Sequence, residues 1–198
     1  MKILKIFFIL LLVFFHTNLK AYSADPKEFV FELVSEVIEK LSSKNLDKKE
    51  KEKFIESIAL EYVDIKALGF YTLGELRKSS SEQDLLKYQT SFEKYFLKSL
   101  TSRLSDYSSS RFEIESFEKK SSNYTIVKSK VTPNDGSPKI KIDWRIYTKD
   151  PDKPLIRDLI VEGLSLARTQ KEEFASILNS NDRDIDALFK ILKEFSDN

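Results

Sequence analysis

The sequence contains no cysteine, and its only histidine is His16. The absence of cysteine excludes disulfides, thiolate metal ligands and a thiol nucleophile. The absence of any histidine beyond position 16 removes the usual general base near neutral pH. Four glycines in 198 residues could hardly supply a loop that cradles phosphate. Carboxylates, lysine, tyrosine and serine are what remains for catalysis, and this composition argues against an enzyme.

The first 23 residues are typical of a secretory signal peptide. Two lysines lie within or beside an apolar run, MKILKIFFILLLVFF, and a polar segment, HTNLKAYS, follows it. The end of that segment, Ala21-Tyr22-Ser23, fits the small-x-small cleavage rule, so we place the cleavage after Ser23. An uncleaved membrane anchor is the alternative, although the run is short for a span of about 20 residues. The sequence therefore predicts an exported chain, and no later segment is apolar enough to span a membrane.

Residues 24–198 are predicted to form a single domain. Removal of residues 1–23 takes away three lysines and no acidic residue, so the formal net charge changes from +1 to −2. A nearly neutral chain has no bulk electrostatic attraction to nucleic acid or to anionic membranes. No internal repeat or low-complexity linker divides these residues.

The N-terminal half has the periodicity of helices. Apolar residues spaced by three and four predict a helix over 26–42 and a second over 47–60. Short helical pieces are expected next, with Asp64 as a cap, and the serines at 79–81 are predicted to cap a long helix that ends near Leu104. The apolar stripe of this long helix consists of Leu85, Tyr88, Phe92, Tyr95, Phe96, Leu100 and Leu104.

The pattern then changes to the alternation typical of strands. Strands are predicted at 111–119, 123–132, 139–149 and 154–163, separated by turn-forming segments such as PNDGSP. One face of the third strand carries Ile140, Ile142, Trp144 and Ile146. Helices resume over 164–178 and from about residue 182. This order predicts an α+β fold, a four-stranded antiparallel sheet with N- and C-terminal helices packed on one face.

Two apolar surfaces are expected to meet in this fold: the inner face of the sheet and the aromatic stripe of the long helix. Periodicity leaves open whether they fill a core or line a cavity. Asp158 and Glu162 lie on one strand but roughly 13 Å apart at 3.3 Å per residue, which exceeds the spacing that glycosidases use. We therefore expect no acid–base role for this pair.

Two stretches resemble the MlaC family, also called the toluene-tolerance family. DIKALGFYTLGELRKSSSEQDLLKYQTSFEKYF, which begins at Asp64, resembles the region where a short helix and a glycine precede an aromatic-rich helix. IRDLIVEGLSLARTQKEEFASIL resembles the strand–acid–glycine–helix stretch of the family, with Asp158, Glu162, Gly163 and Ser165 at matching places. The signal peptide, the four predicted strands and the C-terminal helices fit as well, so the resemblance covers essentially all of residues 24–198.

The resemblance implies a periplasmic lipid carrier that acts as a monomer and needs no cofactor. Such proteins shuttle phospholipid between an outer-membrane lipoprotein–porin complex and an inner-membrane ABC transporter, and so maintain outer-membrane lipid asymmetry. The implied fold is a twisted sheet and helices that enclose a deep apolar pocket for the acyl chains. Relatives tied to hopanoids exist, so the lipid class stays open.

The resemblance also implies which residues form the site. The apolar side chains expected to line the pocket are Phe70, Tyr71, Leu73, Phe92, Phe96, Leu100, Phe112, Ile114, Ile126, Ile140, Ile142, Trp144, Ile146, Leu159, Val161 and Leu164, with Leu166 in its wall. Polar residues of the second stretch, namely Arg157, Asp158, Glu162 and Arg168, are expected at the outer surface and rim. The segment 67–76, which contains two glycines, is expected to gate the pocket.

Two readings from other classes remain beside the carrier. A small exported enzyme of cone-like α+β fold would have to use carboxylates, and the absent histidine counts against it. An adaptor domain with a filled core would hold no lipid. Co-purifying lipid would separate the carrier from both.

Overall fold

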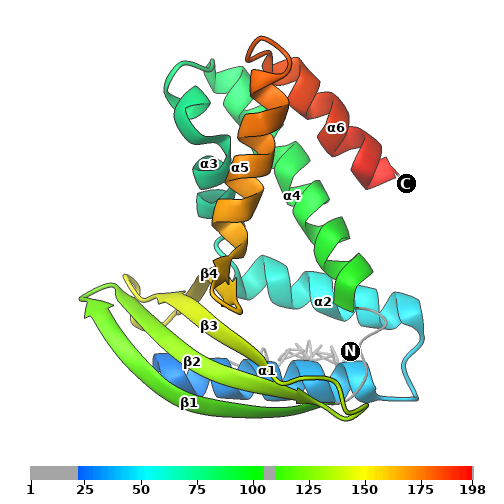
Figure 1. The fold of residues 1–198 in the computed structure, drawn as a ribbon, viewed down its shortest axis with the longest axis vertical. Coiled ribbons are helices and arrows are strands. Elements are labelled where there is room, and N and C mark those ends of the chain that lie inside the picture. Colours follow the sequence, from blue (N-terminus) through cyan, green and yellow to red (C-terminus); the bar gives the residue numbers. More distant parts are fainter. Residues whose placement is uncertain (1–21, 105–109, 198) are drawn as a thin grey trace, which may run out of the picture.

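A computed structural model describes residues 22–104 and 110–197, and it confirms the predicted α+β class (Figure 1). The helices are α1 (Pro26–Ser42), α2 (Lys48–Tyr62), α3 (Ile65–Leu73), the 3-10 helix η1 (Gly74–Lys78), α4 (Glu82–Leu104), α5 (Leu166–Asn179) and α6 (Ile185–Asp197). The strands are β1 (Ser110–Ser121), β2 (Tyr124–Pro133), β3 (Ile140–Tyr147), β4 (Leu155–Val161) and β5 (Leu164–Ser165). Residues 1–21 lie outside this description, so the signal peptide stays a prediction.

The strands form one antiparallel sheet in the order β1-β2-β3-β4-β5. The four predicted strands are present, and β5 adds two residues after a tight turn. Val127, Trp144 and Leu159 lie opposite one another on β2, β3 and β4. Because directly paired residues share a face, this row defines one side of the sheet, which we call the inner face.

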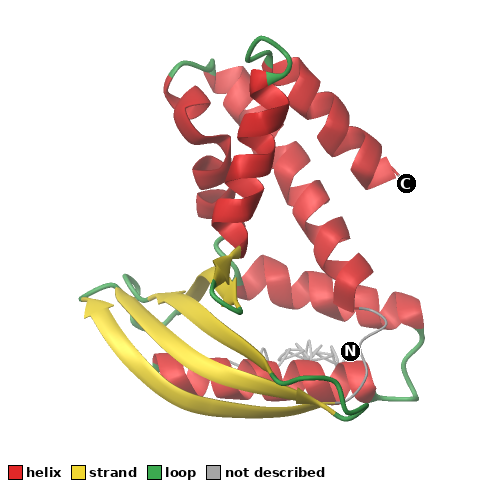
Figure 2. Ribbon diagram, viewed as in Figure 1, coloured by secondary structure: helices red, strands yellow, loops and turns green. Residues whose placement is uncertain are grey.

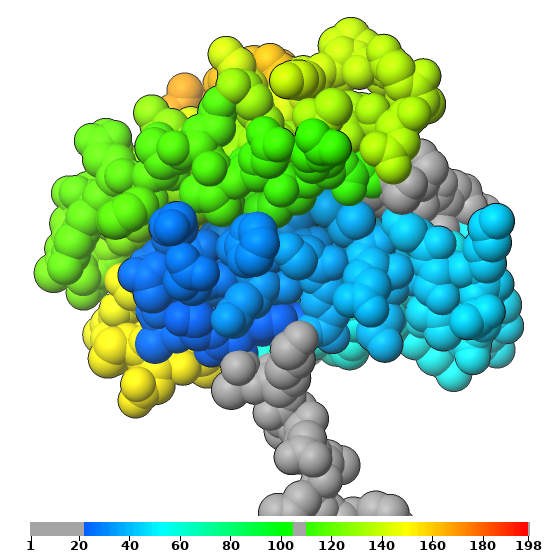
Figure 3. All heavy atoms as spheres, turned by 90° about the horizontal axis from the view of Figure 1, so that it is seen from below, coloured from blue at the N-terminus to red at the C-terminus, as the bar shows by residue number. Residues whose placement is uncertain are grey.

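The inner face packs on α1, which runs along the curved sheet (Figures 1 and 2). The helical spacing of α1 turns Phe29, Val30 and Leu33 inward, where all three are buried. The buried members of this sheet cluster are Tyr22, Phe29, Val30, Leu33, Val34, Tyr62, Val127, Trp144, Ile146 and Ile156. Seen from below, α1 and α2 form a continuous strip of surface, with β1 beside α1 (Figure 3).

The remaining helices build a separate apolar core, the helical cluster. Its buried members come from α3, α4, α5 and α6: Ile65, Leu73, Tyr88, Phe92, Phe174, Leu178, Leu188, Phe189 and Leu192. The expectation that the aromatic stripe of α4 faces the sheet is therefore wrong. Phe92 packs on Phe174 of α5 with ring centroids 6.3 Å apart, and Tyr95 packs on Phe195 of α6 at 4.8 Å. The apolar faces of other helices cover the stripe, and helical periodicity does not tell whether a stripe packs on helices or on a sheet.

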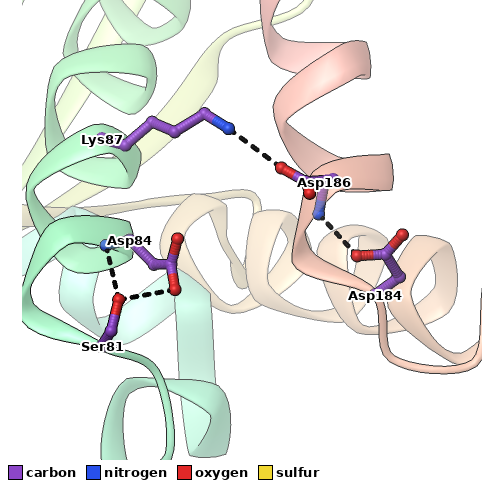
Figure 4. Close-up of polar contacts among 5 residues, drawn as sticks. All are labelled: Ser81, Asp84, Lys87, Asp184 and Asp186. Atoms are coloured by element: carbon purple, nitrogen blue, oxygen red, sulfur yellow. Dashed lines mark hydrogen bonds and ion pairs between the residues drawn. The ribbon is translucent and has the colours of Figure 1, made fainter.

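Polar contacts fix the ends of these helices. As predicted, the serine run caps α4: the backbone N–H of Asp84 donates to Ser81 Oγ at 3.1 Å (Figure 4). One turn later, Lys87 Nζ lies 2.9 Å from Asp186 Oδ1 on α6 (Figure 4). Asp64 caps α3, also as predicted, by accepting from the N–H of Ala67.

Among the described strands only β2 pairs with β1, so β1 is an edge of the sheet. Its register with β2 shifts between Ile114 and Ser116 and again between Lys119 and Ser121. The residue inside the first shift, Glu115, forms an ion pair with Lys130 of β2. The edge is thus bulged and charged rather than regular.

Candidate functional site

The inner face of the sheet is the candidate site because it joins a buried apolar floor to half-buried apolar side chains. Trp144 is buried in the floor, and Phe112 meets it edge-on with ring centroids 6.3 Å apart. Around the floor, Phe112, Ile114, Ile142 and Leu159 are only partly covered and pack against the sheet cluster. Partly covered apolar side chains beside a closed floor form the kind of surface on which an apolar ligand binds.

The polar atom of the floor is fully satisfied. Trp144 Nε1 donates to Ser129 Oγ at 2.8 Å, and Ser129 Oγ donates to the carbonyl oxygen of Ile142 at 2.9 Å. A buried donor without a partner would be costly beside an apolar ligand. Our sequence analysis missed Ser129, although it alternates in phase with Val127 and Val131, and that parity could have revealed its inward position.

The predicted pocket residues divide between the sheet and the helices. The sheet and the turn after it carry Phe112, Ile114, Ile140, Ile142, Trp144, Ile146, Leu159, Val161 and Leu164. The helices carry Phe70, Tyr71, Leu73, Phe92, Phe96 and Leu100, of which Leu73 and Phe92 are buried inside the helical cluster. Tyr71 is exposed, with Lys171 Nζ 5.1 Å from its ring centre.

The structure places Ile126 on the opposite face of the sheet from Trp144. It lies opposite Arg145, whereas its neighbour Val127 lies opposite Trp144. Ile126 therefore faces away from the inner face and cannot line a pocket there. The adjacent Ile126 and Val127 gave the strand two apolar phases, and the sequence did not say which one turns inward.

An exposed apolar group stands at the end of the inner face where β3 begins and β4 turns back. Ile140 is 36% exposed, Leu164 is 68% exposed and Leu166 is 42% exposed. Val161 lies opposite both Ile142 and Leu164 in the sheet, so Ile140 and Leu164 continue the inner face to its edge, and Leu166 follows at the start of α5. We call Ile140, Leu164 and Leu166 the apolar lip.

The lip depends on a two-residue turn between β4 and β5. Glu162 has φ 49° and Gly163 has φ 84°, so both central residues are left-handed, as a type I′ turn requires. Gly163 adopts this conformation without steric cost, which permits the sharp reversal of the chain after β4. A carboxylate oxygen of Glu162 accepts from the N–H of Lys141 and ties the turn to β3.

The prediction that Asp158 lies at the outer surface or rim is wrong, because the residue is only 6% exposed. Its carboxylate accepts from Ser165 Oγ at 2.6 Å and from the N–H of Ala167 at 3.0 Å. Arg145 lies 3.5 Å away on β3. The acidic residue of this stretch therefore holds the start of α5 against the sheet.

Arg157 is half-buried and links the sheet to the helices. Its Nε and Nη2 both lie 2.7 Å from Asp64 Oδ2, and its guanidinium carbon lies 3.3 Å from the centre of the Tyr147 ring. The N–H of Asp64 also donates to the carbonyl oxygen of Ile156 at 2.9 Å. Val63 packs against both clusters at this point. We call Val63, Asp64, Ile156 and Arg157 the junction.

The predicted gate at 67–76 is built into the helical cluster. A Cβ on Gly69 would come within 2.9 Å of Phe92 Cδ1, so α3 crosses α4 closely there. Thr72 is buried and hydrogen-bonded to the Tyr88 hydroxyl at 2.9 Å. The segment thus packs on α4 through Gly69 and Thr72, while Tyr71 on its other side is exposed, and a gating role for 67–76 stays a prediction.

Comparison with known proteins decides the family. A family model described as MlaC protein matches residues 31–194. The chain belongs to the MlaC family. It is also similar to a phospholipid-binding protein from Ralstonia solanacearum, whose structure was determined in complex with a phospholipid. The TM-score is 0.71 at 17% sequence identity, over 86% of this chain and 96% of the other.

The hydrogen bonds of the strand–acid–glycine–helix stretch give it a structural role. Asp158 and Ser165 anchor the start of α5, and Glu162 with Gly163 forms the turn between them. The stretch shapes the lip and orients a helix.

Two surface depressions lie beside the loop between β3 and β4. Their volumes are about 370 and 440 Å³, and Asp150, Lys153 and Leu155 contribute to both. No predicted pocket residue lines either depression.

Within residues 22–104 and 110–197, no group of three or more acidic, histidine or cysteine side chains is placed to hold a metal ion. Across the same residues, no helix combines the length and apolarity needed to cross a membrane.

Proposed function

We propose that this chain is a periplasmic lipid carrier that binds phospholipid acyl chains on the inner face of its sheet. The observation that carries the proposal is an apolar face that runs from the Trp144 floor to the exposed lip, in a member of the MlaC family. The similarity to a protein whose structure contains a phospholipid supports it. Binding requires no covalent chemistry, which fits the composition.

Energetics favours an enclosed site over a shallow one. At about 0.8 kcal/mol per buried methylene, two chains with roughly 30 methylenes are worth on the order of 24 kcal/mol. A flat surface would recover only part of this, so the helices must cover the chains. We propose that the helical cluster moves relative to the sheet about the junction, and that the chains enter past the lip.

The headgroup has the opposite preference, because charge is costly to bury without partners. We therefore place it in water beyond the lip, where Lys141 and Arg168 are exposed. Contacts there are weak in water, so headgroup selectivity is expected to be low. The donor and acceptor of the lipid would be an outer-membrane lipoprotein–porin complex and an inner-membrane ABC transporter.

Lipid extraction and mass spectrometry of the protein purified from the periplasm without detergent test the proposal. The expected result is about one phospholipid per chain, with mixed headgroups. A hopanoid in its place would keep the carrier and change the cargo. Protein that is folded and free of lipid, and that takes up none from vesicles, would contradict lipid carriage.

A further inference from the structure

Tyr22 lies ahead of the first helix and is nevertheless part of the sheet cluster. It is 9% exposed, and its ring lies 4.8 Å from that of Tyr62 and 6.2 Å from that of Phe29. The Phe29 and Tyr62 rings are 5.8 Å apart, so the three aromatics form a closed group. Edge-to-face pairs at these distances contribute beyond their buried area.

Polar contacts fix the same segment. The Tyr22 hydroxyl donates to Glu36 Oε2 at 3.1 Å, and the N–H of Ser23 donates to Glu32 Oε2 at 2.8 Å. Both acceptors lie on α1, one turn apart. Burial raises the pKa of Tyr22, and the hydrogen bond to Glu36 raises it further. The chain is thus folded onto α1 two residues before the cleavage position that the small-x-small rule favours.

We propose that processing occurs between Ala21 and Tyr22, so that the mature protein begins with Tyr22. This proposal rests on export, which is part of the proposed function. Hydrolysis adds one water across the Ala21–Tyr22 amide, which leaves a carboxylate on Ala21 and an ammonium group on Tyr22. Ala21 supplies the small residue that a signal peptidase needs before the cut. Leu19, the third residue before this cut, is larger than the rule prefers, and we favour this cut because the folded domain uses the Tyr22 ring.

Cleavage after Ser23 would discard groups that the fold uses. It would remove a buried ring from between Phe29 and Tyr62 and open a gap, which well-packed interiors tolerate poorly. It would also leave Glu32 without the Ser23 N–H. The Tyr22 ring packs on Phe29 and Tyr62, and the Ser23 N–H donates to Glu32. We therefore expect both residues to be part of the mature protein.

The test is to express the full chain with its own leader, isolate the periplasmic protein and determine its first residue by intact mass and N-terminal peptide mapping. A chain that begins with Tyr22 supports the proposal. A chain that begins with Ala24 overturns it and leaves lipid carriage untouched. A chain that retains Met1 overturns both the processing and the export on which it rests.

Thermal unfolding of periplasmic variants provides an independent arm. If Tyr22 is retained, Tyr22→Ala lowers the Tm by several degrees, and Tyr22→Phe, which keeps the ring and loses the hydroxyl, lowers it less. If processing occurs after Ser23, these variants yield the same mature chain as the wild type. Identical Tm values for all three would therefore overturn the proposal.

Discussion

Arg157 and Asp64 are 93 positions apart in the chain, yet two guanidinium nitrogens of Arg157 lie 2.7 Å from one oxygen of Asp64. The pair joins β4 to the start of α3, where the sheet cluster and the helical cluster meet. It is partly buried, with 26% and 17% of the two side chains exposed. Such a pair is screened less by solvent than an exposed one.

Replacement of Arg157 by alanine is expected to lower the free energy of unfolding by about 1–2 kcal/mol, because charge-assisted bonds to Asp64 are lost. Denaturant titration followed by circular dichroism measures this loss. Lys78→Ala is the matched control, since it removes an exposed ion pair with Glu75 and should leave the midpoint unchanged. Equal midpoints for both variants would show that the junction pair does not stabilise the fold.

The Asp158→Asn variant is expected to loosen the start of α5. The new amide group faces donors that the carboxylate accepts from, Ser165 Oγ and the N–H of Ala167, so about 2–3 kcal/mol of stability should be lost. Hydrogen exchange at the Ala167 amide should become faster. Asp182→Asn makes the same chemical change in an exposed loop with φ 52°, a conformation that asparagine tolerates. Unaltered exchange at Ala167 in Asp158→Asn would contradict the anchoring role.

The two faces of the sheet provide a matched test of the site. Ile142→Glu places a carboxylate on the inner face, which should abolish lipid retention because an unpaired charge is costly in an apolar site. Ile126→Glu places the same group on the opposite face of β2 and should keep a normal lipid load. Lipid per chain by mass spectrometry is the readout, with circular dichroism to confirm folding. A folded Ile142→Glu protein with full lipid content would place the acyl chains elsewhere.

These two isoleucines also illustrate what the sequence could predict. Period-two alternation identified the strands and the inward side of β3, because Trp144 and the isoleucines share one phase. It failed on β2, where Ile126 and Val127 are adjacent. The helices were predictable from spacing and caps, such as Ser81 and Asp64, because these are local features.

The partners of each apolar stripe could not be predicted. The spacing of Phe92 and Tyr95 would be the same if they packed on a sheet or on helices. Periodicity gives only the direction of a side chain relative to its own helix. The burial of Asp158 likewise depends on β5 and α5 folding back over β4. The packing of Tyr22 on Phe29 and Tyr62 could not be predicted either, because the cleavage rule considers residue size and ignores later packing.

Buried tyrosines predict the response to alkaline pH. Burial raises the pKa of Tyr62 from 10.0 to about 12, and burial also raises the pKa values of Tyr22 and Tyr88. The folded state then holds these protons more tightly than the unfolded state. The stabilisation is complete below pH 10, the unfolded value, and is lost as the pH rises through the folded values.

Denaturant midpoints measured from pH 8 to pH 12, together with tyrosinate absorbance, test this response. The midpoint is expected to fall above about pH 10, and part of the tyrosinate signal should appear only as the protein unfolds. Tyr88→Phe should make the fall shallower. If all tyrosines titrate near pH 10 in the folded protein, the burial-linked shifts are refuted.

The irregular edge at β1 has a consequence for collisions between copies of the chain. A straight unpaired strand is a template on which another molecule can add its own strand, and repeated addition leads to fibres. In β1 the bulge at Glu115 interrupts the row of free backbone groups, and Arg111, Glu113 and Lys119 place charges along it. Two copies that meet at this edge have neither a continuous hydrogen-bond register nor an apolar seam. Two molecules can therefore collide at high concentration without joining their sheets.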